Sequence, residues 1–502
     1  MLAAVVFMVS ASAGLGGVVE SFVLHEPVSV VGADTLRVDA VRPETFNAET
    51  VSAGTLRAEA VGLSTVQADA VQIVPIAQAY SAADASLDRG APVAESPRTV
   101  SFDEAALNRL GGMALLRVLS TLSPREIIGF AEQNPAQLDM VRDARIAPSQ
   151  VVGWWQGMTA DTRAALVQSA PQLIGSLDGL PAAVRGPANE QALQRAMADT
   201  KERAESGIGK GERRRLGQQQ RMLEAVAAAL PGKPGEPTRT LLEFDERDTG
   251  RAVIVIGDLD TAEYVSYLVP GMYFSVQQQI LDWTDTAASL AVEQQRWLQD
   301  RPGDTMPGVA AAGRVATVAW LGYQTPDLLT IGGLELAESG ADALEASWQG
   351  IRAARGGQQP FLAVLAHSYG STAALIALER HNEQIDALAL IGSPGSASQS
   401  VHDLGVAGDK VYVGEASWDP IVDTAFYGSD PGSASYGAKR IGVGGGIDPL
   451  TKQKLSASVG HNAYFAAGSE SQRNLALIGI GRGDWVTDAG GLPPGSTVAS
   501  AR

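Results

Sequence analysis

Residues 361–370 read Phe-Leu-Ala-Val-Leu-Ala-His-Ser-Tyr-Gly, and this stretch decides the fold. Its short apolar run predicts a buried parallel strand. The run Ser-Thr-Ala-Ala-Leu-Ile-Ala-Leu that begins at residue 371 predicts a helix. The small residues Ala366 and Gly370 permit a tight turn between the two elements, and this turn lifts Ser368 off the end of the strand.

A strand, a sharp turn that carries a serine, and a helix together form the nucleophile elbow of an α/β-hydrolase, usually written Gly-x-Ser-x-Gly. Ala366 stands where the first glycine is usual, which adds one methyl group to the turn. The sequence therefore predicts Ser368 as a nucleophile. The alternative is a structural serine on another doubly wound sheet.

Composition sets limits on the possible functions. The 502 residues are 45% apolar and 19% charged, which indicates a mostly globular chain of two or three domains. The net charge of −18 argues against nucleic acid or an anionic membrane surface as a partner. The absence of cysteine excludes thiol nucleophiles, thiolate metal sites and disulfides. The five histidines leave few candidates for a catalytic base.

Residues 1–24 predict a secretory signal peptide or a membrane anchor. Met1–Val19 carries no charged side chain, and Ala11-Ser12-Ala13 resembles a cleavage site. The basic residues that usually precede such an apolar core are missing, so an apolar first helix of a cytoplasmic protein remains open. We expect a secreted or envelope-associated protein, with possible membrane anchoring through the N-terminus. The alternative is a cytoplasmic location.

Two regions precede the predicted catalytic domain. Residues 33–72 repeat with a period of five, which suits either a short β-helical coil or a low-complexity stalk. Residues 95–235 predict a helical region that includes a cap. In this region, the charged run at 201–215 is interpreted as a solvated helix face. The breaker Pro231-Gly-Lys-Pro-Gly-Glu-Pro237 marks the expected domain boundary.

Residues 236–502 alternate between strand and helix patterns, which predicts a mostly parallel, doubly wound sheet. The expected strands are 241–244, 252–256, 264–269, 315–320, 361–365, 387–391 and 410–413, the first two of them antiparallel. The expected helices outside the elbow are 277–298, 334–355 and 470–480.

The catalytic base is predicted from chain order. In α/β-hydrolases the triad runs Ser, then Asp or Glu, then His, with the histidine in a late loop. His461, in Gly-His-Asn-Ala-Tyr, fits this order. His367 lies beside the nucleophile and is expected to pack, His381 closes the elbow helix, and His402 precedes the strand that should deliver the acid.

Asp419 is the predicted acid because it follows the strand at 410–413 by one short loop, with Asp423 and Asp430 as alternatives. The oxyanion hole is predicted to combine the backbone N–H groups of Tyr369 and Met272. An ordinary Pro-Gly turn at 270–271 is the alternative for Met272. The pair Asp258 and Asp260 is interpreted as a turn rather than a metal site, so we expect no metal and no cofactor.

Several further stretches occur in an order that resembles an actinobacterial α/β-hydrolase family formerly described as a domain of unknown function. The stretches, besides the elbow, are Val152-Gly-Trp-Trp155, Leu173–Asn189, Gly257–Ala262, Leu268–Met272, Ala319–Tyr323, Gly392–Gly395 and Gly468–Ser471. The resemblance covers about residues 154–481. It implies a serine-hydrolase fold in which the triad maps onto Ser368, Asp419 and His461, and in which residues 154–189 form a cap that belongs to the hydrolase.

Two classes of function follow from these observations. The first is a cofactor-free serine hydrolase that cleaves a small-molecule carboxylic ester through an acyl-enzyme, with Trp154, Trp155 and Trp320 as candidates to shape an acyl pocket. Acyl transfer would use the same triad. The second is a catalytically silent hydrolase fold that serves as a binding or scaffold protein of the cell envelope.

Overall fold

The computed structural model describes residues 110, 112–300, 314–422 and 424–489. The predicted signal or anchor at 1–24 and the pentad repeat at 33–72 lie outside these residues. In the part of the chain that is described, no helix combines the length and the apolar character needed to cross a membrane.

An eight-stranded sheet forms the centre of the domain, in the order β1-β2-β4-β3-β5-β6-β7-β8. The strand pairs β1–β2 and β2–β4 are antiparallel, and all later neighbours are parallel. The strands are β1 Arg239–Asp245, β2 Arg251–Ile256, β3 Tyr264–Val269, β4 Val315–Leu321, β5 Phe361–His367, β6 Ala387–Ile391, β7 Val411–Gly414 and β8 Lys439–Arg440. A separate two-stranded sheet pairs β9 Gly446–Ile447 with β10 Lys454–Leu455.

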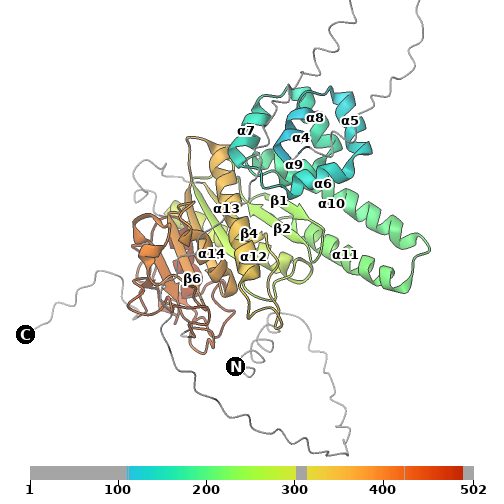
Figure 1. Cartoon of the computed structure of the whole chain (residues 1–502). Coiled ribbons are helices and arrows are strands. Elements are labelled where there is room, and N and C mark those ends of the chain that lie inside the picture. Colours follow the sequence, from blue (N-terminus) through green and yellow to red (C-terminus); the bar gives the residue numbers. More distant parts are fainter. Residues whose placement is uncertain (1–109, 111, 301–313, 423, 490–502) are drawn as a thin grey trace, which may run out of the picture. The chain divides into compact units, whose positions relative to one another are not determined.

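Helices cover both faces of the large sheet, which explains why every residue of β3, β4, β5 and β6 is buried. Helices α11, α12 and α15 contribute to the core on one face, and α13 and α14 contribute to the core on the other. Their bounds are α11 Lys210–Ala229, α12 Val276–Asp300, α13 Glu335–Arg355, α14 Tyr369–Glu379 and α15 Glu470–Gly479. Figure 1 labels α12, α13 and α14 over the sheet.

Residues 112–205 form seven further helices, all of which contribute to a core of their own. They are α4 Gly112–Leu119, α5 Pro124–Gln133, α6 Pro135–Asp143, α7 Pro148–Gln156, α8 Ala160–Ser169, α9 Pro171–Ser176 and α10 Ala182–Glu205. The buried Asn189 of α10 donates from Nδ2 to the carbonyls of Leu241 (3.0 Å) and Leu242 (2.8 Å), where β1 shifts register. Arg142 of α6 pairs with Asp245 at the end of β1. The helical region is therefore fastened to the edge strand through polar contacts.

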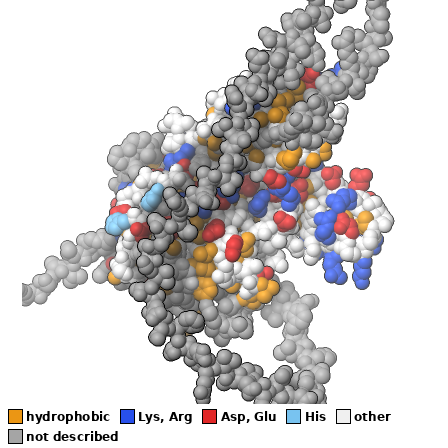
Figure 2. All heavy atoms as spheres, in the orientation of Figure 1, with side chains coloured by type: hydrophobic (Ala, Val, Ile, Leu, Met, Phe, Trp, Pro, Cys, Tyr) orange, Lys and Arg blue, Asp and Glu red, His pale blue; other side chains and the backbone are white. Residues whose placement is uncertain are grey.

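The predicted fold class is confirmed, because the mostly parallel sheet, the helices on both faces and the helical region before them are all present. Each expected strand and helix of the α/β domain agrees with an observed element to within two residues at either end. The charged run at 201–215 spans the end of α10 and the start of α11, where Glu212 pairs with Arg203 and Arg215. Figure 2 shows basic and acidic side chains intermixed over the α10–α11 hairpin.

Candidate active site

The elbow places Ser368 between β5 and α14 in a strained backbone conformation. Its φ of 55° and ψ of −132° lie in a region that residues with a side chain seldom adopt. The Ser368 N–H donates to the Ile391 carbonyl of β6 (3.0 Å), and the Ser368 carbonyl accepts from the Ser371 N–H (2.9 Å). These hydrogen bonds hold the turn in place, as a nucleophile elbow requires.

The methyl group of Ala366 fits this turn. Ala366 is fully buried in the apolar core and pairs with Val269 of β3 and Leu390 of β6. Gly370, in contrast, has no room for a side chain, because a Cβ there would collide with the carbonyl of Pro270. Of the two small residues of the elbow, Gly370 therefore tolerates a side chain less well than position 366.

The structure brings Ser368, His461 and Asp419 together in one hydrogen-bonded chain. Ser368 Oγ lies 2.7 Å from His461 Nε2, and His461 Nδ1 lies 2.9 and 3.0 Å from the two carboxylate oxygens of Asp419. All three residues are buried. Asp419 follows β7 by a short loop, and His461 lies in the loop between β10 and α15, so elements distant in sequence converge on the elbow.

Asp430, His402 and His381, which the sequence offered as alternatives, lie elsewhere. Asp430 accepts from the Gly432 N–H within a turn (2.8 Å), and Asp423 lies outside the described residues. His402 faces Asp409 at 3.4 Å. His381 is exposed just beyond the end of α14.

The carboxylate of Asp419 has further hydrogen-bond donors. The Tyr464 hydroxyl donates to Oδ2 (2.6 Å), and the Ile421 N–H donates to Oδ1 (2.9 Å). Burial by itself would raise the pKa of Asp419, but the hydrogen bonds from His461 and Tyr464 and the charge of His461 hold this pKa below its usual range. Asp419 is therefore an ionised, tightly held partner for the imidazole.

Tyr464 is a residue to which the sequence analysis gave no role. Its hydroxyl accepts from the Ala416 N–H (2.9 Å) while it donates to Asp419. Burial and the nearby Asp419 charge raise the pKa of Tyr464, so the hydroxyl keeps its proton. The available signal was its position three residues after His461.

His367 does more than the packing expected of it. Its Nε2 lies 2.7 Å from the carbonyl oxygen of His461, and the two rings lie 4.6 Å apart. Burial, together with the neighbouring His461, lowers the pKa of His367 to about 3. A carbonyl can only accept, so neutral His367 carries its proton on Nε2 and fixes the backbone of His461.

The loop after β3 lies directly against Ser368. A Cβ on Gly271 would come within 2.5 Å of Ser368 Cβ and 2.9 Å of Ser368 Oγ, so only glycine fits there. The Tyr323 hydroxyl donates to the Pro270 carbonyl (2.8 Å) and anchors this loop. Among the described residues, neither the Met272 N–H nor the Tyr369 N–H has a hydrogen-bond acceptor.

Gly392 follows the end of β6 and packs against Asp419 and His461. A Cβ at this position would lie 2.9 Å from Asp419 Oδ2 and 3.1 Å from His461 Nδ1. With a φ of 58°, the residue also adopts a conformation that favours glycine. In the sequence, Gly392 was notable only as part of the family resemblance. The structure gives a physical reason why glycine occupies this position.

Two further expectations from the sequence concerned three tryptophans and a pair of aspartates. Trp154 and Trp155 are buried in the core of the helical region, and Trp320 of β4 is fully buried on one face of the sheet. Asp260 accepts from the N–H groups of Ala182 (2.8 Å) and Ala183 (2.9 Å) at the start of α10. In the described residues, no group of three or more potential metal-ligating side chains gathers at one place.

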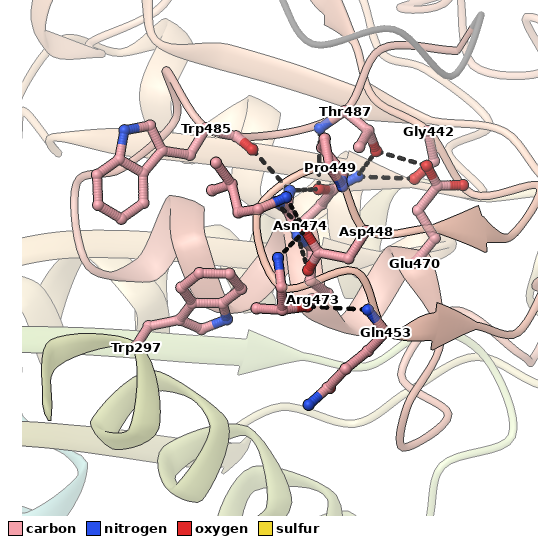
Figure 3. Close-up of polar contacts among 12 residues, drawn as sticks. Trp297, Gly442, Asp448, Pro449, Gln453, Glu470, Arg473, Asn474, Trp485 and Thr487 are labelled. Carbon is pink, nitrogen blue, oxygen red and sulfur yellow. Dashed lines mark hydrogen bonds and ion pairs between the residues drawn. The ribbon is translucent and has the colours of Figure 1, made fainter. Parts of the chain in front are cut away.

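A second buried polar cluster surrounds Arg473 on α15 (Figure 3). Arg473 donates to both carboxylate oxygens of Asp448 (3.2 Å each), to Asn474 Oδ1 (2.8 Å) and to the Trp485 carbonyl (2.6 Å). Its guanidinium lies 5.3 Å from the centre of the Trp297 ring. Arg473 and Asp448 are 2% and 1% exposed. This cluster ties the terminal helix to the strand-poor segment before it.

The fold and the strained serine define a protein of the α/β-hydrolase class. Residues 245–429 match a family model described as alpha/beta hydrolase, in agreement with the family resemblance of the sequence. Among curated proteins, the uncharacterized protein Rv2079 of Mycobacterium tuberculosis is 27% identical over 385 residues, which are 68% of this chain. The chain spans 57% of the length of that relative. An uncharacterized Mycobacterium bovis protein, Mb0988c, is 28% identical over 45% of this chain and 84% of its own length.

Two solved structures are also similar to this chain. A carboxyl esterase of Tuber melanosporum is 12% identical, with a TM-score of 0.29, over 51% of this chain and 89% of its own. An esterase of Pyrobaculum calidifontis is 15% identical, with a TM-score of 0.28, over 59% and 97% of the two chains.

Proposed function

We propose that this chain is a serine hydrolase that cleaves carboxylic esters through an acyl-enzyme intermediate. The observation that carries the proposal is the hydrogen-bonded chain from Ser368 Oγ through His461 to Asp419, with distances of 2.7 and 2.9 Å. A serine hydroxyl is a poor nucleophile unless a base lies within hydrogen-bond reach and a third group orients that base. Ser368 has both partners, and it lies at a strained elbow.

The chemistry follows from the positions of the protons. His461 Nε2 takes the proton of Ser368 Oγ as the oxygen attacks the ester carbonyl, and the ionised Asp419 stabilises the imidazolium that results. His461 then gives the proton to the leaving alcohol. In the second half of the reaction, His461 activates a water molecule that releases the acid and restores Ser368.

The oxyanion formed in both halves requires donors that are already oriented. The N–H groups of Met272 and Tyr369 fit this role, because they flank Ser368 and have no acceptor among the described residues. Neutral His367 supports the proposal in a different way. Since its pKa is about 3, it does not compete as a base in the neutral range.

The test treats the full chain with a fluorophosphonate probe and with 4-nitrophenyl butyrate, beside Ser368→Ala. We expect probe labelling and turnover in the wild type. In Ser368→Ala labelling should be lost and turnover should fall by about 10⁴-fold or more. Ser120→Ala is the matched control, because that hydroxyl bonds only the Arg117 carbonyl at the end of α4.

Two outcomes contradict the proposal. A folded wild type that neither labels nor turns over would favour a silent hydrolase fold that binds a partner. Labelling that persists in Ser368→Ala would place the nucleophile elsewhere. Adding an alcohol and analysing the products would separate hydrolysis from acyl transfer, because both use the same three residues.

A further inference from the structure

Exposed apolar side chains are concentrated around the candidate active site. Of the twelve large apolar side chains that are exposed in the described residues, seven lie in the loops that follow β3, β4 and β7 or precede α15. We call these seven the apolar rim. They are Tyr273, Leu328, Leu329, Leu334, Trp418, Phe426 and Val459. The two most exposed are Leu329 at 92% and Trp418 at 86%.

The apolar rim is connected to the reacting groups through short links. Trp418 directly precedes Asp419, and the adjacent Ser417 pairs with Val459, two residues before His461. Tyr273 directly follows Met272, and its hydroxyl accepts from the Leu328 N–H (3.1 Å). The rim thus continues outward from both sides of Ser368.

Two members of the rim adopt costly backbone conformations. Tyr273 and Trp418 have φ values of 60° and 64°, in a region that large side chains seldom occupy. Such strain persists only where the surrounding structure imposes it, and it tends to mark functional positions. Here it occurs in the residues next to the predicted oxyanion donor and next to the acid.

The loops that carry the rim are fixed by hydrogen bonds. Asp327 accepts from the N–H groups of Leu329 (2.9 Å) and Thr330 (3.0 Å), which holds the turn with Leu329 at its tip. The Tyr427 hydroxyl donates to the Ile331 carbonyl, and its ring lies 5.6 Å from that of Tyr369. Leu329 and Trp418 are therefore presented outward by ordered loops.

We infer that the apolar rim binds the hydrocarbon chain of the substrate, so that this enzyme acts on long-chain acyl esters. The inference rests on the proposed esterase function and names its substrate class. Exposed apolar surface gains free energy only when another apolar group covers it, and an acyl chain attached to the reacting carbonyl is held in place at this site.

The test measures kcat/KM of the full chain on 4-nitrophenyl acetate, butyrate, octanoate and dodecanoate, each below its aggregation concentration. We expect the wild type to prefer dodecanoate over butyrate by about tenfold or more, which is the discrimination that a few buried methylenes provide. In Trp418→Ala and in Leu329→Ala, the loss should grow with chain length, from about twofold on butyrate to about tenfold on dodecanoate. Trp418→Leu should retain most of the preference.

Val292→Ala is the matched control, because Val292 is a half-exposed apolar residue on α12 and lies outside the rim. Its chain-length profile should equal that of the wild type. An equal loss on all four esters in Trp418→Ala would show that Trp418 only positions Asp419, and a wild type without chain preference would also overturn the inference. Failure of the esterase proposal looks different, because then no ester is cleaved or cleavage survives Ser368→Ala.

Discussion

His461–Asp419 and Arg473–Asp448 are both buried pairs of a basic side chain and an aspartate, but only the first of them contacts a further reactive group. Arg473 uses four of its five N–H donors on Asp448, Asn474 and the Trp485 carbonyl. The His461–Asp419 pair ends instead at Ser368 Oγ, and the nearby N–H groups of Met272 and Tyr369 have no acceptor among the described residues. Both pairs are hydrogen-bonded and buried, so burial and charge do not distinguish them. What distinguishes the His461–Asp419 pair is the presence of unused N–H donors beside a strained serine.

The largest expected effect comes from exchanging the acid in each pair for its amide. Asp419→Asn should lower kcat by about 10⁴-fold, because an amide cannot stabilise the imidazolium and favours the wrong tautomer of His461. The thermal midpoint should fall only modestly, by the stability that the lowered pKa of Asp419 contributes at neutral pH. The measurement is turnover of a nitrophenyl ester, together with a thermal melt of each variant.

Asp448→Asn is the matched control for this first prediction. It should reduce stability, while the folded protein at low temperature keeps its kcat to within about threefold, because Asp448 contacts no group of the triad. If both amide variants lost activity equally, the distinction between the two pairs would fail.

The second prediction concerns the contribution of the Arg473–Asp448 pair to the free energy of unfolding. Arg473→Met retains much of the side-chain volume over Trp297 but leaves the Asp448 carboxylate buried without its cation. Breaking a buried pair in this way costs about 3–5 kcal/mol in free energy of unfolding. Denaturant titration at neutral pH measures the loss.

Arg296→Met serves as the comparison for Arg473→Met. The Arg296 guanidinium also lies 5.3 Å from the centre of the Trp297 ring, but its side chain is 34% exposed and pairs with Glu293 on the same helix. We expect a loss of about 1 kcal/mol or less, as for other exposed ion pairs. Equal losses in the two variants would mean that the contact with Trp297, rather than the buried ion pair, stabilises the cluster.

The third prediction tests the hydrogen bond behind the acid. Tyr464→Phe removes the donor to Asp419 Oδ2 and leaves the Ala416 N–H without its acceptor. A hydrogen bond to a charged group contributes about 1.5–3 kcal/mol, so kcat should fall by about tenfold and the acidic limb of the pH–rate profile should move upward. A profile that keeps its position would reduce Tyr464 to a packing role.

Tyr436→Phe is the matched control for Tyr464→Phe. Its hydroxyl is also buried and bonds Ser398 (2.8 Å), away from the triad. We expect the pH–rate profile of this variant to match that of the wild type, with a change in thermal midpoint alone.

The sequence predicted the parts of the site that chain order and local pattern determine. The elbow, the strand before it and the order of serine, acid and base all have short sequence signatures, and Ser368, Asp419 and His461 lie together in the fold. Tyr464, His367 and Gly392 act through contacts between loops that are far apart in sequence. A tyrosine near a histidine or a glycine after a strand has no signature of its own until the sheet order is known.

The tryptophans show how little residue type says about exposure. Trp154, Trp155 and Trp320 drew attention by residue type alone, and packing within the helical core and the sheet buries all three. The exposed Trp418 attracted no notice, because an aromatic residue beside an Asp-Pro pair resembles any surface turn. Exposure depends on the whole fold, and a local pattern carries little information about it.

The smallest expected effect is the contribution of Asp419 and Asp448 to the pH dependence of the free energy of unfolding. Burial would raise the pKa of each carboxyl, but hydrogen bonds from His461 to Asp419 and from the Leu450 N–H and Arg473 to Asp448 leave both pKa values below the usual range. A lowered pKa in the folded state contributes stability that is fully present above the unfolded value of about 3.9 and is lost as the pH falls through the folded value. The free energy of unfolding should therefore decline as the pH falls below about 4.

Each amide variant removes one titrating group, so each should show a shallower decline than the wild type between about pH 4 and pH 2. Denaturant titration at several pH values measures this slope, and Asp430→Asn provides the control, because Asp430 accepts only within its own turn. If Asp448→Asn changed the slope and Asp419→Asn did not, the His461–Asp419 pair would contribute nothing to the free energy of unfolding. In that case the contacts around Asp419 would serve the chemistry alone, and the two pairs would differ in energetics as well as in geometry.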